Sequence, residues 1–216
     1  MLDFEKVCFS YGDKAVLKNF DFSIGEGRIT AVLGPSGFGK TTLLELAAGF
    51  LKPQSGNIKS VCSKKCSFVF QEDRLLPWKT ALENLTAVNI EKAHAMKYLE
   101  KVGLQNDMDK YPEELSGGMQ RRLAIARSLA FGGDLFFLDE PLRGLDIKTS
   151  AEILELIKSE LSGKTVLMVT HSPAEAFILA DRIVIVGKNP LEILADKEKT
   201  DFADEIELAG FLKSVI

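Results

Sequence analysis

The sequence predicts an α/β protein with a mainly parallel, covered sheet and an inserted helical region. Two observations carry this expectation. Toward both ends of the 216-residue chain, apolar runs of strand length alternate with helical segments, which is typical of a parallel sheet covered by helices. From about Lys79 to Ala130, by contrast, only helical signals are found. The chain is therefore expected to be one α/β domain that is interrupted by a helical insert.

The expected strands lie on either side of that insert. Two alternating segments open the chain and are linked by a turn at residues 11–13, and a later buried strand leads into a helix over Lys40 to Phe50. A further helix, which connects two later strands, carries Ile153, Ile157 and Leu161 on one face. The strands are expected at Leu2–Phe9, Val16–Ile24, Arg28–Leu33, Ser67–Phe70, Asp134–Leu138, Thr165–Val169 and Arg182–Val186.

Two helical features stand out in the insert and in the tail. Thr80 and Glu83 have the spacing of a capping box. An amphipathic run that ends at Gly103 is formed by Ala93, Met96, Tyr98, Leu99 and Val102. The tail from Asp201 to Ile216 is expected to form an acidic helix that docks on the core, since acids repel anionic lipid. Its apolar face is expected to carry Phe202, Ile206 and Ala209.

Composition limits the classes of function. The net charge of -4 argues against a nucleic-acid binder, whose footprint would be basic. No apolar run approaches the roughly 20 residues that cross a bilayer, and the first residues lack a signal-peptide core. We therefore expect a cytosolic protein, in which the three cysteines, including Cys62 and Cys66, are free thiols.

The residues after the expected strand Arg28–Leu33 match the phosphate-binding pattern G-x-x-x-x-G-K-[ST]. Because the match lies between a strand and a helix, its backbone N–H groups and the helix N-terminus are expected to face phosphate. Lys40 should reach the β- and γ-phosphates, and the Thr41 hydroxyl should bind Mg²⁺. The matching residues are Gly34, Pro35, Ser36, Gly37, Phe38, Gly39, Lys40 and Thr41.

Two acids follow a second apolar strand. Asp139 and Glu140 come directly after Leu135–Leu138, at the carboxyl end of the strand, where α/β proteins bind ligands. Asp139 suits the Mg²⁺ shell, and Glu140 suits positioning or deprotonating the attacking water. Alone the pair would be an ordinary solvent-facing turn, but together with the phosphate loop it predicts a nucleotide hydrolase.

The segment Leu115-Ser116-Gly117-Gly118-Met119-Gln120 narrows the class. With it the chain resembles the ABC ATPase family, whose signature is L-S-G-G-Q or L-S-G-G-M-Q. The resemblance spans nearly the whole chain. It implies a P-loop NTPase of ABC type, with a RecA-like mainly parallel core, an N-terminal antiparallel β-subdomain and an inserted helical subdomain. The single domain, 1–216, would then divide into a core, 1–75 and 131–216, and a helical subdomain, 76–130.

The resemblance also assigns residues outside the two nucleotide motifs. Tyr11 matches the aromatic that stacks on adenine, and Gln71 matches the glutamine that senses the γ-phosphate and couples to the membrane partner. Asp146, after Leu145, matches the end of the loop that crosses between two subunits, and His171 matches the switch histidine at the γ-phosphate. The resemblance therefore implies ATP and Mg²⁺ as cofactors, with catalysis by Lys40, Gln71, Glu140 and His171.

In the family two subunits sandwich two ATP molecules head to tail, so a homodimer or a paired ATPase subunit is expected. The signature of one subunit would face the phosphate loop of the other. The implied nucleotide contacts are Tyr11, residues 34–42 with Thr42 included, Ser116, Gly117, Gly118 and Asp146. The implied metal ligands are Thr41, Gln71 and Asp139.

The segment from Gln71 to Trp78, followed by Thr80–Leu85, resembles the importers of nitrate, sulfonates and taurine. This implies an integral membrane permease, an external solute-binding protein met indirectly, and a place on the cytoplasmic face of the membrane. Leu76 or Trp78 is expected to line a groove for a cytoplasmic helix of the permease. The alternative is that these side chains pack inside the helical insert.

Several readings stay open at this stage. Besides an importer subunit, the chain could be a soluble ABC ATPase of repair or translation, an exporter, or a regulator that binds ATP without turnover. Phe38 and Arg143-Gly144 depart from the family pattern. The backbone binds phosphate at Phe38, so this change need not abolish binding, whereas Arg143-Gly144 puts intersubunit coupling in doubt. The sequence does not name the transported solute.

Overall fold

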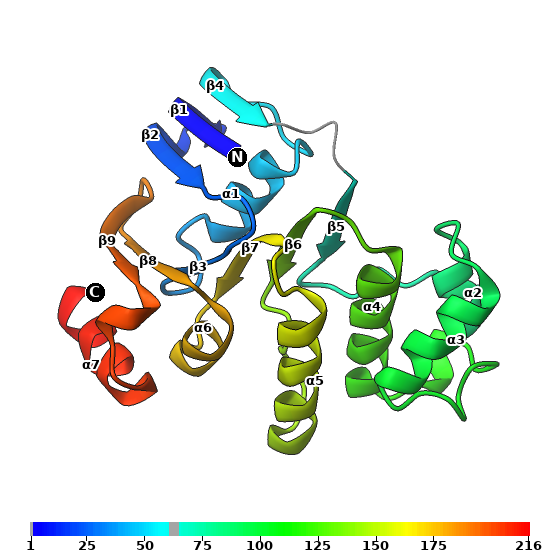
Figure 1. Cartoon of the computed structure of the whole chain (residues 1–216). Helices are drawn as coiled ribbons and strands as arrows, with labels where there is room; N and C mark the ends of the chain where they lie inside the picture. The colour runs from blue at the N-terminus through cyan, green and yellow to red at the C-terminus, as the bar shows by residue number, and fades with distance from the viewer. Residues whose placement is uncertain (1, 61–64) are drawn as a thin grey trace. The chain divides into compact units, whose positions relative to one another are not determined.

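The structure, a computed structural model, describes residues 2–60 and 65–216 (Figure 1). Contacts within the chain divide it into two compact units. Unit 1 comprises Met1–Cys66, Asp134–Asp139 and Leu161–Ile216, and unit 2 comprises Ser67–Gly133 and Glu140–Glu160. The segment 76–130, expected to be a helical subdomain, lies within unit 2.

The first sheet of unit 1 is antiparallel. It has the order β2-β1-β4, formed by Leu2–Tyr11 (β1), Lys14–Ile24 (β2) and Ser55–Ser60 (β4). Strands β1 and β2 bury alternate apolar side chains, as period-2 patterning requires when one face meets a core. Phe4 packs edge-on against Phe20, with ring centroids 6.3 Å apart. The expected N-terminal antiparallel β-subdomain is therefore present.

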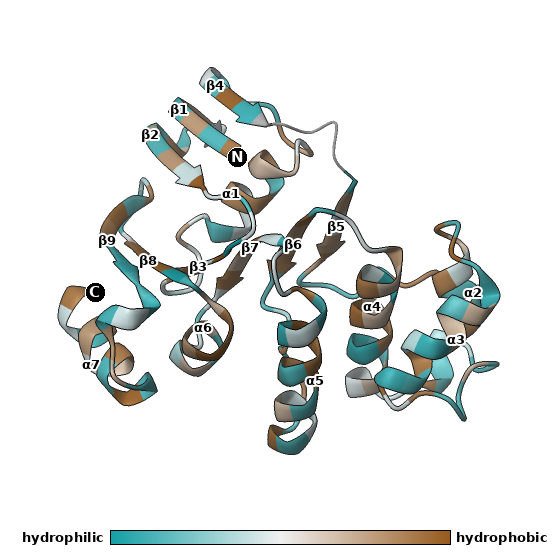
Figure 2. Ribbon diagram, in the orientation of Figure 1, coloured by the Kyte–Doolittle hydropathy of each residue, from teal (hydrophilic) through white to brown (hydrophobic). Residues whose placement is uncertain are grey.

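The second sheet of unit 1 is mainly parallel, with the order β6-β7-β3-β8-β9. Only the pairing of β8 with β9 is antiparallel. Every residue of β3, β6 and β7 is buried, because the sheet is covered on both faces, and these strands are mainly brown in Figure 2. The bounds are Ile29–Leu33 (β3), Leu135–Asp139 (β6), Thr165–Thr170 (β7), Arg182–Gly187 (β8) and Glu192–Glu198 (β9).

The register of this sheet brings three strand ends level with one another. Leu33 at the end of β3 pairs with Thr170 at the end of β7. Asp139 at the end of β6 pairs with Val169, one residue earlier in β7. The residues that follow these strands therefore emerge at one edge of the sheet, the carboxyl edge at which α/β proteins bind ligands.

Three α-helices accompany these sheets. Helix α1 (Lys40–Ala47) packs against β6, β7 and β4, and α6 (Pro173–Leu179) packs against β3 and β7 (Figure 1). Helix α1 ends at Ala47 and not at Phe50 as expected, because Gly49 takes a left-handed φ of 76° that stops the helix. Helix α7 (Glu205–Val215) packs against α6 and follows a short 3-10 turn, Lys199–Asp201.

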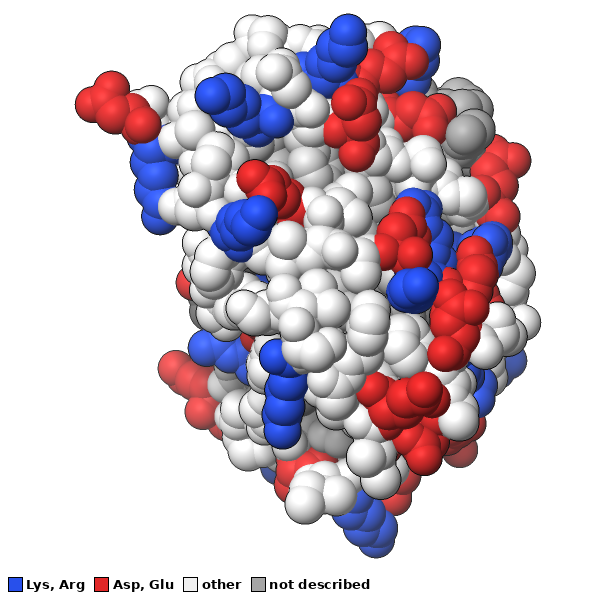
Figure 3. Space-filling model, turned by 90° about the vertical axis from the view of Figure 1, so that its left-hand side faces the viewer, with Lys and Arg blue, Asp and Glu red and all other residues white. Residues whose placement is uncertain are grey.

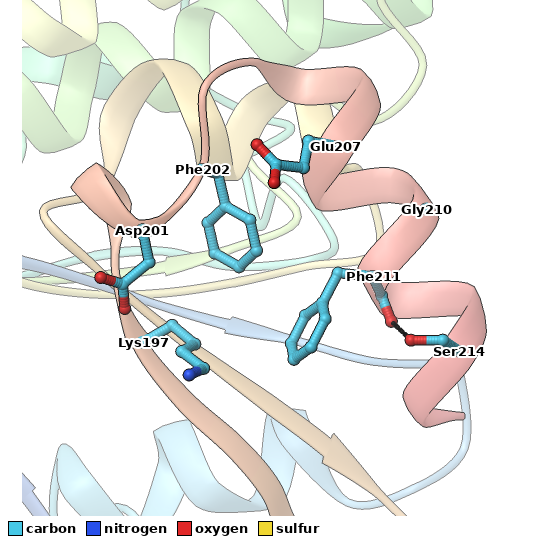
Figure 4. Close-up of a pocket in the computed structure, with 7 residues that line it drawn as sticks. All are labelled: Lys197, Asp201, Phe202, Glu207, Gly210, Phe211 and Ser214. Atoms are coloured by element: carbon cyan, nitrogen blue, oxygen red, sulfur yellow. Dashed lines mark hydrogen bonds between the residues drawn. The ribbon is translucent and has the colours of Figure 1, made fainter.

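The expected docking of the acidic tail on the core is confirmed, but the prediction that Ile206 belongs to its apolar face is wrong. Phe202 and Leu208 are buried, whereas Ile206 is 75% exposed. The helix begins only at Glu205, so Phe202 lies on the preceding turn and the buried stripe starts at Leu208. Figure 4 shows Phe202 facing Phe211 of α7 across an open hollow, with ring centroids 5.5 Å apart.

Unit 2 is mostly helical. The capping box before α2 is confirmed: Thr80 Oγ1 accepts a hydrogen bond from the Glu83 N–H at 3.3 Å, and the Glu83 carboxylate accepts one from the Thr80 N–H at 3.0 Å. The α-helices are Ala81–Thr86 (α2), Lys92–Lys101 (α3), Gly117–Phe131 (α4) and Ile147–Glu160 (α5), with a 3-10 turn at Pro112–Glu114. The strand expected at Ser67–Phe70 is Cys66–Val69 (β5).

The expected apolar face of α3 is half right. Tyr98, Leu99 and Val102 are buried, but Met96 is 40% exposed and Ala93 is also exposed. Ala95, which the amphipathic run did not include, is fully buried instead. The buried positions 95, 98, 99 and 102 follow the i, i+3, i+4, i+7 spacing of a helical face.

No helix in the described ranges has both the length and the apolar character needed to cross a membrane. The face in Figure 3 carries acidic and basic side chains that are interspersed, and neither sign gathers into one large patch on it. Cys8 and Cys66 form no disulfide in the described structure. Cys62 lies outside the described residues, so its expected thiol state stays a prediction.

Candidate functional site

The phosphate-binding motif forms the connection from β3 to α1 in unit 1. Lys40, the first residue of α1, is only 5% exposed. Its Nζ donates hydrogen bonds to the carbonyls of Gly34 at 2.7 Å and Pro35 at 2.6 Å. The loop is thus drawn around the ammonium group, which places a positive charge at the centre of the turn. Thr41 is half-buried and Thr42 is buried at the start of the same helix.

Gly39 shows that this loop is tightly fitted. It precedes α1 with a φ of 87°, a conformation that side chains other than glycine rarely adopt. A Cβ atom at this position would lie 2.4 Å from Val16 Cγ1 of β2. Only glycine therefore allows the chain to turn here into the helix N-terminus, where backbone N–H groups are free to face an anion.

Asp139 and His171 belong to the same edge of the unit 1 sheet. Asp139 ends β6 and is 2% exposed, and His171 directly follows β7 and is exposed. The turn at His171 is fixed by its neighbours: Thr170 Oγ1 donates to the Glu175 carboxylate at 2.7 Å and accepts from the Ser172 N–H at 3.0 Å. The strand register therefore brings the loop after β3, Asp139 and the His171 turn to one edge.

Tyr11 is the last residue of β1, in the antiparallel sheet of unit 1. Its side chain is 52% exposed, and Phe9 supports the ring edge-on, with centroids 5.0 Å apart. A ring that is supported on one side and open on the other is suited to stack on a base.

The remaining expected site residues lie in unit 2. Gln71 follows β5 and Phe70 and has an exposed side chain. Glu140 is 9% exposed and has a φ of 46°, in the left-handed region that a residue with a side chain occupies at a cost of about 1–3 kcal/mol. Such strain persists only where the surroundings fix the backbone, so neighbouring groups must hold the backbone of Glu140 in this conformation.

The signature forms the N-terminus of α4. Ser116 is the N-cap residue, and its Oγ accepts a hydrogen bond from the Met119 N–H at 3.3 Å. Gly117 is exposed and Gly118 is half-buried, and the helix then runs for 15 residues. This capping is compatible with the expected contact to phosphate, because it leaves the first N–H groups of a long helix directed outward.

Asp146 caps α5. Its Oδ1 accepts a hydrogen bond from the Thr149 N–H at 3.0 Å, and this bond lowers the pKa of the exposed carboxyl group below its ordinary value. Asp146 is therefore ionised and placed on a helix N-terminus, which favours negative charge. Of the two departures from the family pattern, Phe38 is half-buried in the phosphate loop, and Arg143 is exposed four residues before α5.

Arg121 was missed by the sequence analysis. It lies on α4, is 3% exposed, and donates hydrogen bonds to backbone carbonyls beside both Gln71 and Glu140. A pair of arginines at 121 and 122 on a surface helix suggests solvent exposure, so only the fold reveals which of the two is buried.

Comparison with known proteins agrees with this arrangement. The family model described as "ABC transporter" matches residues 17–143. The chain is 39% identical over 219 residues to "Aliphatic sulfonates import ATP-binding protein SsuB 3" of Pseudomonas savastanoi pv. phaseolicola, covering 96% of this chain and 81% of that protein. It is 42% identical over 181 residues to the protein of the same name from Paraburkholderia xenovorans, covering 82% and 72%.

Solved structures give the same result. The chain superimposes on the "Dimeric Structure of MJ0796, a Bacterial ABC Transporter Cassette" with a TM-score of 0.84 and 30% identity, covering 92% of this chain and 99% of that one. A second match, with a TM-score of 0.83 and 30% identity over the same shares, is a post-hydrolysis state of that cassette bound to ADP and Pi.

An α/β core with a phosphate loop, two consecutive acids at the end of a strand and directly after it, and a signature helix define an ATP-hydrolysing subunit. The chain belongs to the ABC transporter family. It is an ATPase of the kind that powers transport, so the expected family, fold class and enzyme class are confirmed.

Proposed function

We propose that this ATPase powers import through a separate membrane permease and that the imported solute is a small organic oxyanion such as an aliphatic sulfonate. The names of the relatives support this choice, since those quoted above are sulfonate import subunits. They favour transport over the soluble alternative. The observation that carries ATP hydrolysis is structural: the phosphate loop follows β3, Asp139 ends β6 and His171 follows β7, and these neighbouring strands end in register.

Nucleotide binding would use unit 1 in two places. The N–H groups of residues 34–42 and the Lys40 ammonium would surround the β- and γ-phosphates, because the loop already bends around that charge. Tyr11 would stack on adenine with its open face. The loop contacts only phosphates, and Tyr11 contacts only the ring face of the base. These contacts therefore position the nucleotide but discriminate little between bases.

We expect Mg²⁺ to accompany the nucleotide. Thr41, Gln71 and Asp139 would supply a hydroxyl, an amide and a carboxylate oxygen, which are the hard donors that this ion prefers. When bound, Mg²⁺ would neutralise charge that develops on the phosphates. Asp139 suits the task because it is 2% exposed, so that water competes little for its carboxylate.

Hydrolysis would be in-line attack of water on the γ-phosphate. Glu140 would orient the water and accept its proton, and His171 and Lys40 would hold charge on the transferring group. Gln71 would sense the γ-phosphate. The backbone of Glu140 is fixed in a strained conformation, as expected for a residue whose carboxylate must meet water in one orientation.

A complete site would need two subunits. Ser116, Gly117 and Gly118 would offer the N-terminus of α4 to the γ-phosphate bound by a partner, with Asp146 at the crossing loop. The dimeric cassette among the similar structures supports this arrangement. An external solute-binding protein would deliver the solute, and the ATPase would sit on the cytoplasmic face of the membrane.

Replacing Glu140 with glutamine tests the hydrolytic assignment. The amide cannot accept the proton, so kcat for ATP hydrolysis should fall by about 10²–10⁴-fold while nucleotide affinity is kept. The control is Glu155→Gln, an exposed acid on α5, which should leave kcat unchanged. Single-turnover hydrolysis at a near-native rate in Glu140→Gln would exclude Glu140 as the base.

The permease would dock at the segment that carries Trp78. That side chain is 70% exposed, so the alternative of internal packing is wrong for Trp78. The buried Asn84 fixes the segment: its amide nitrogen donates to the carbonyls of Leu76, Lys79 and Thr80, and its Oδ1 accepts from the Leu76 N–H. An exposed tryptophan in a segment that is held on both sides, beside a half-buried Leu76, is typical of an interface anchor.

Trp78→Ala should therefore weaken co-purification with the permease and leave basal ATPase intact. Loss of an anchoring tryptophan costs about 2 kcal/mol or more, which is roughly a 30-fold change in Kd. Ile206→Ala is the matched control, because it removes a side chain that is 75% exposed on α7. Equal losses in both variants, or a parallel fall in thermal stability and ATPase for Trp78→Ala, would exclude docking at Trp78.

A further inference from the structure

Arg121 occupies an unusual place for a charged side chain. It is 3% exposed within unit 2, and burying a guanidinium is costly unless its donors find acceptors. Its Nη1 lies 3.0 Å from the carboxylate oxygen Asp73 Oδ1. The guanidinium also donates to four main-chain carbonyls. The contacts of Arg121 therefore mainly hold main-chain segments of unit 2 in place.

Those carbonyls belong to two segments that are far apart in the sequence. On one side, Nε donates to Pro141 O at 2.8 Å and Nη2 donates to Glu140 O at 2.7 Å. On the other side, Nη1 donates to Phe70 O at 2.6 Å and lies 3.5 Å from Gln71 O. The planar fork of an arginine suits this task, since it presents several donors in fixed directions.

The contacts to Glu140 and Pro141 fall where the backbone is strained. Glu140 has a φ of 46°, and such a conformation persists only when surrounding groups over-determine it. Arg121 binds the carbonyl of Glu140 and that of the next residue, so it fixes the peptide that follows Glu140. The orientation of the Glu140 side chain depends on this peptide.

The contact to Phe70 acts in the same way on Gln71. The Phe70 carbonyl belongs to the peptide that precedes Gln71. A hydrogen bond to this carbonyl therefore fixes the position of the Gln71 backbone nitrogen. Arg127 on the same helix secures the next residues, with bonds of 3.0 Å to the carbonyls of Asp73 and Arg74. The backbones of the proposed base and of the proposed γ-phosphate sensor are thus both bound by one guanidinium on the signature helix.

We propose that Arg121 is a positioning residue for ATP hydrolysis: it sets Glu140 and Gln71 together and ties both to α4. This inference rests on the proposed roles of Glu140 and Gln71. We expect Arg121 to act on catalysis and not on nucleotide binding, because the hydrogen bonds described above hold the backbone at Glu140 and beside Gln71. Removing it should therefore affect kcat and leave KM and nucleotide affinity nearly unchanged.

The decisive variant is Arg121→Lys, which keeps the charge but cannot span both segments. Misplacing a reacting group by about 1 Å can cost on the order of 100-fold in rate, so kcat for steady-state ATP hydrolysis should fall by about that factor. KM and the Kd of a fluorescent ATP analogue should stay within about threefold of the wild type. Arg121→Gln, which likewise can donate to only one segment, should lower kcat by a similar factor.

The chain offers a matched control one residue away. Arg122 donates to Val102 O at 2.5 Å, at the end of α3 and away from both segments. Arg122→Lys makes the same chemical change and should leave kcat within about threefold of the wild type. Asp73→Asn removes the carboxylate charge beside Arg121 while keeping the carbonyl contacts, and it too should retain most of kcat.

Each variant is assayed well below its own melting temperature, so that unfolded protein does not lower the rate. A near-native kcat for Arg121→Lys under these conditions overturns the proposal. So does a loss that Arg122→Lys shares, or a rise in KM and Kd in parallel with the fall in kcat. Glu140→Gln distinguishes failure of the proposed function from failure of the role of Arg121. If Glu140→Gln keeps hydrolysis, the proposed function fails. If Glu140→Gln loses hydrolysis and Arg121→Lys does not, only the role of Arg121 fails.

Discussion

Replacing Gly39 by alanine tests whether the phosphate loop depends on its close approach to β2. A matched position exists in the same loop. Gly37 and Gly39 have nearly the same φ, 85° and 87°. A Cβ at Gly37 would meet nothing within 4 Å, whereas one at Gly39 would lie 2.4 Å from Val16 Cγ1. The two variants share the backbone strain and differ in the collision.

The magnitudes follow from these contacts. Left-handed backbone costs an alanine roughly 1–2 kcal/mol, and the lower entropy of the unfolded chain returns about 0.4–1 kcal/mol. Gly37→Ala should therefore destabilise the protein by about 1 kcal/mol. Gly39→Ala adds an overpacking cost of about 1–3 kcal/mol, because Val16 is 6% exposed and its branched side chain has little room to turn.

Thermal denaturation measures the difference. For a chain of this size, 1 kcal/mol corresponds to roughly 2–4 °C, so Gly39→Ala should melt about 2–12 °C below Gly37→Ala. Val16→Ala removes the colliding methyl group. The double variant Val16→Ala/Gly39→Ala should therefore lose less stability than the sum of the two single changes. Equal melting temperatures for Gly37→Ala and Gly39→Ala, or strict additivity in the cycle, would refute the close approach.

Two further changes probe the proposed site. Ser116→Arg should block the ATP-bound dimer of the Glu140→Gln background in gel filtration while single-subunit ATP affinity is kept, since the signature would act on the partner's nucleotide; a persisting dimer would contradict the sandwich. Tyr11→Ala should weaken ATP and GTP binding alike, by about 1–3 kcal/mol for the loss of base stacking. Unchanged binding of a fluorescent nucleotide would place adenine elsewhere.

The strands that carry the nucleotide motifs could be predicted because they are buried on both faces. Strands β3, β6 and β7 are continuous apolar runs, a pattern that few other structures share. Strand β9 was missed for the opposite reason. Its sequence, EILADKE, carries four charges, as edge strands often do to discourage further pairing. Such a segment resembles a loop until its partner β8 is known.

In the candidate site, too, some residues could be predicted from the sequence and others could not. Motifs predicted the phosphate loop, Asp139 and the signature, because each has a fixed local spacing that suits its chemistry. Arg121 has no such spacing, since its partners Phe70 and Glu140 are 51 and 19 residues away in the sequence. The exposure of Trp78 was likewise open, because an apolar side chain suits a core and an interface equally.

The level strand ends have a consequence for how this protein can change during evolution. Alternate residues of a strand point to opposite faces, and each residue advances the chain by about 3.3 Å. Deleting one residue inside β6 would therefore turn Asp139 to the wrong face of the sheet or pull it back from its neighbours, while an insertion after Thr170 would leave the register intact. The sheet register therefore fixes the positions of the site residues, and tolerated insertions and deletions should be confined to the segments that follow the strands.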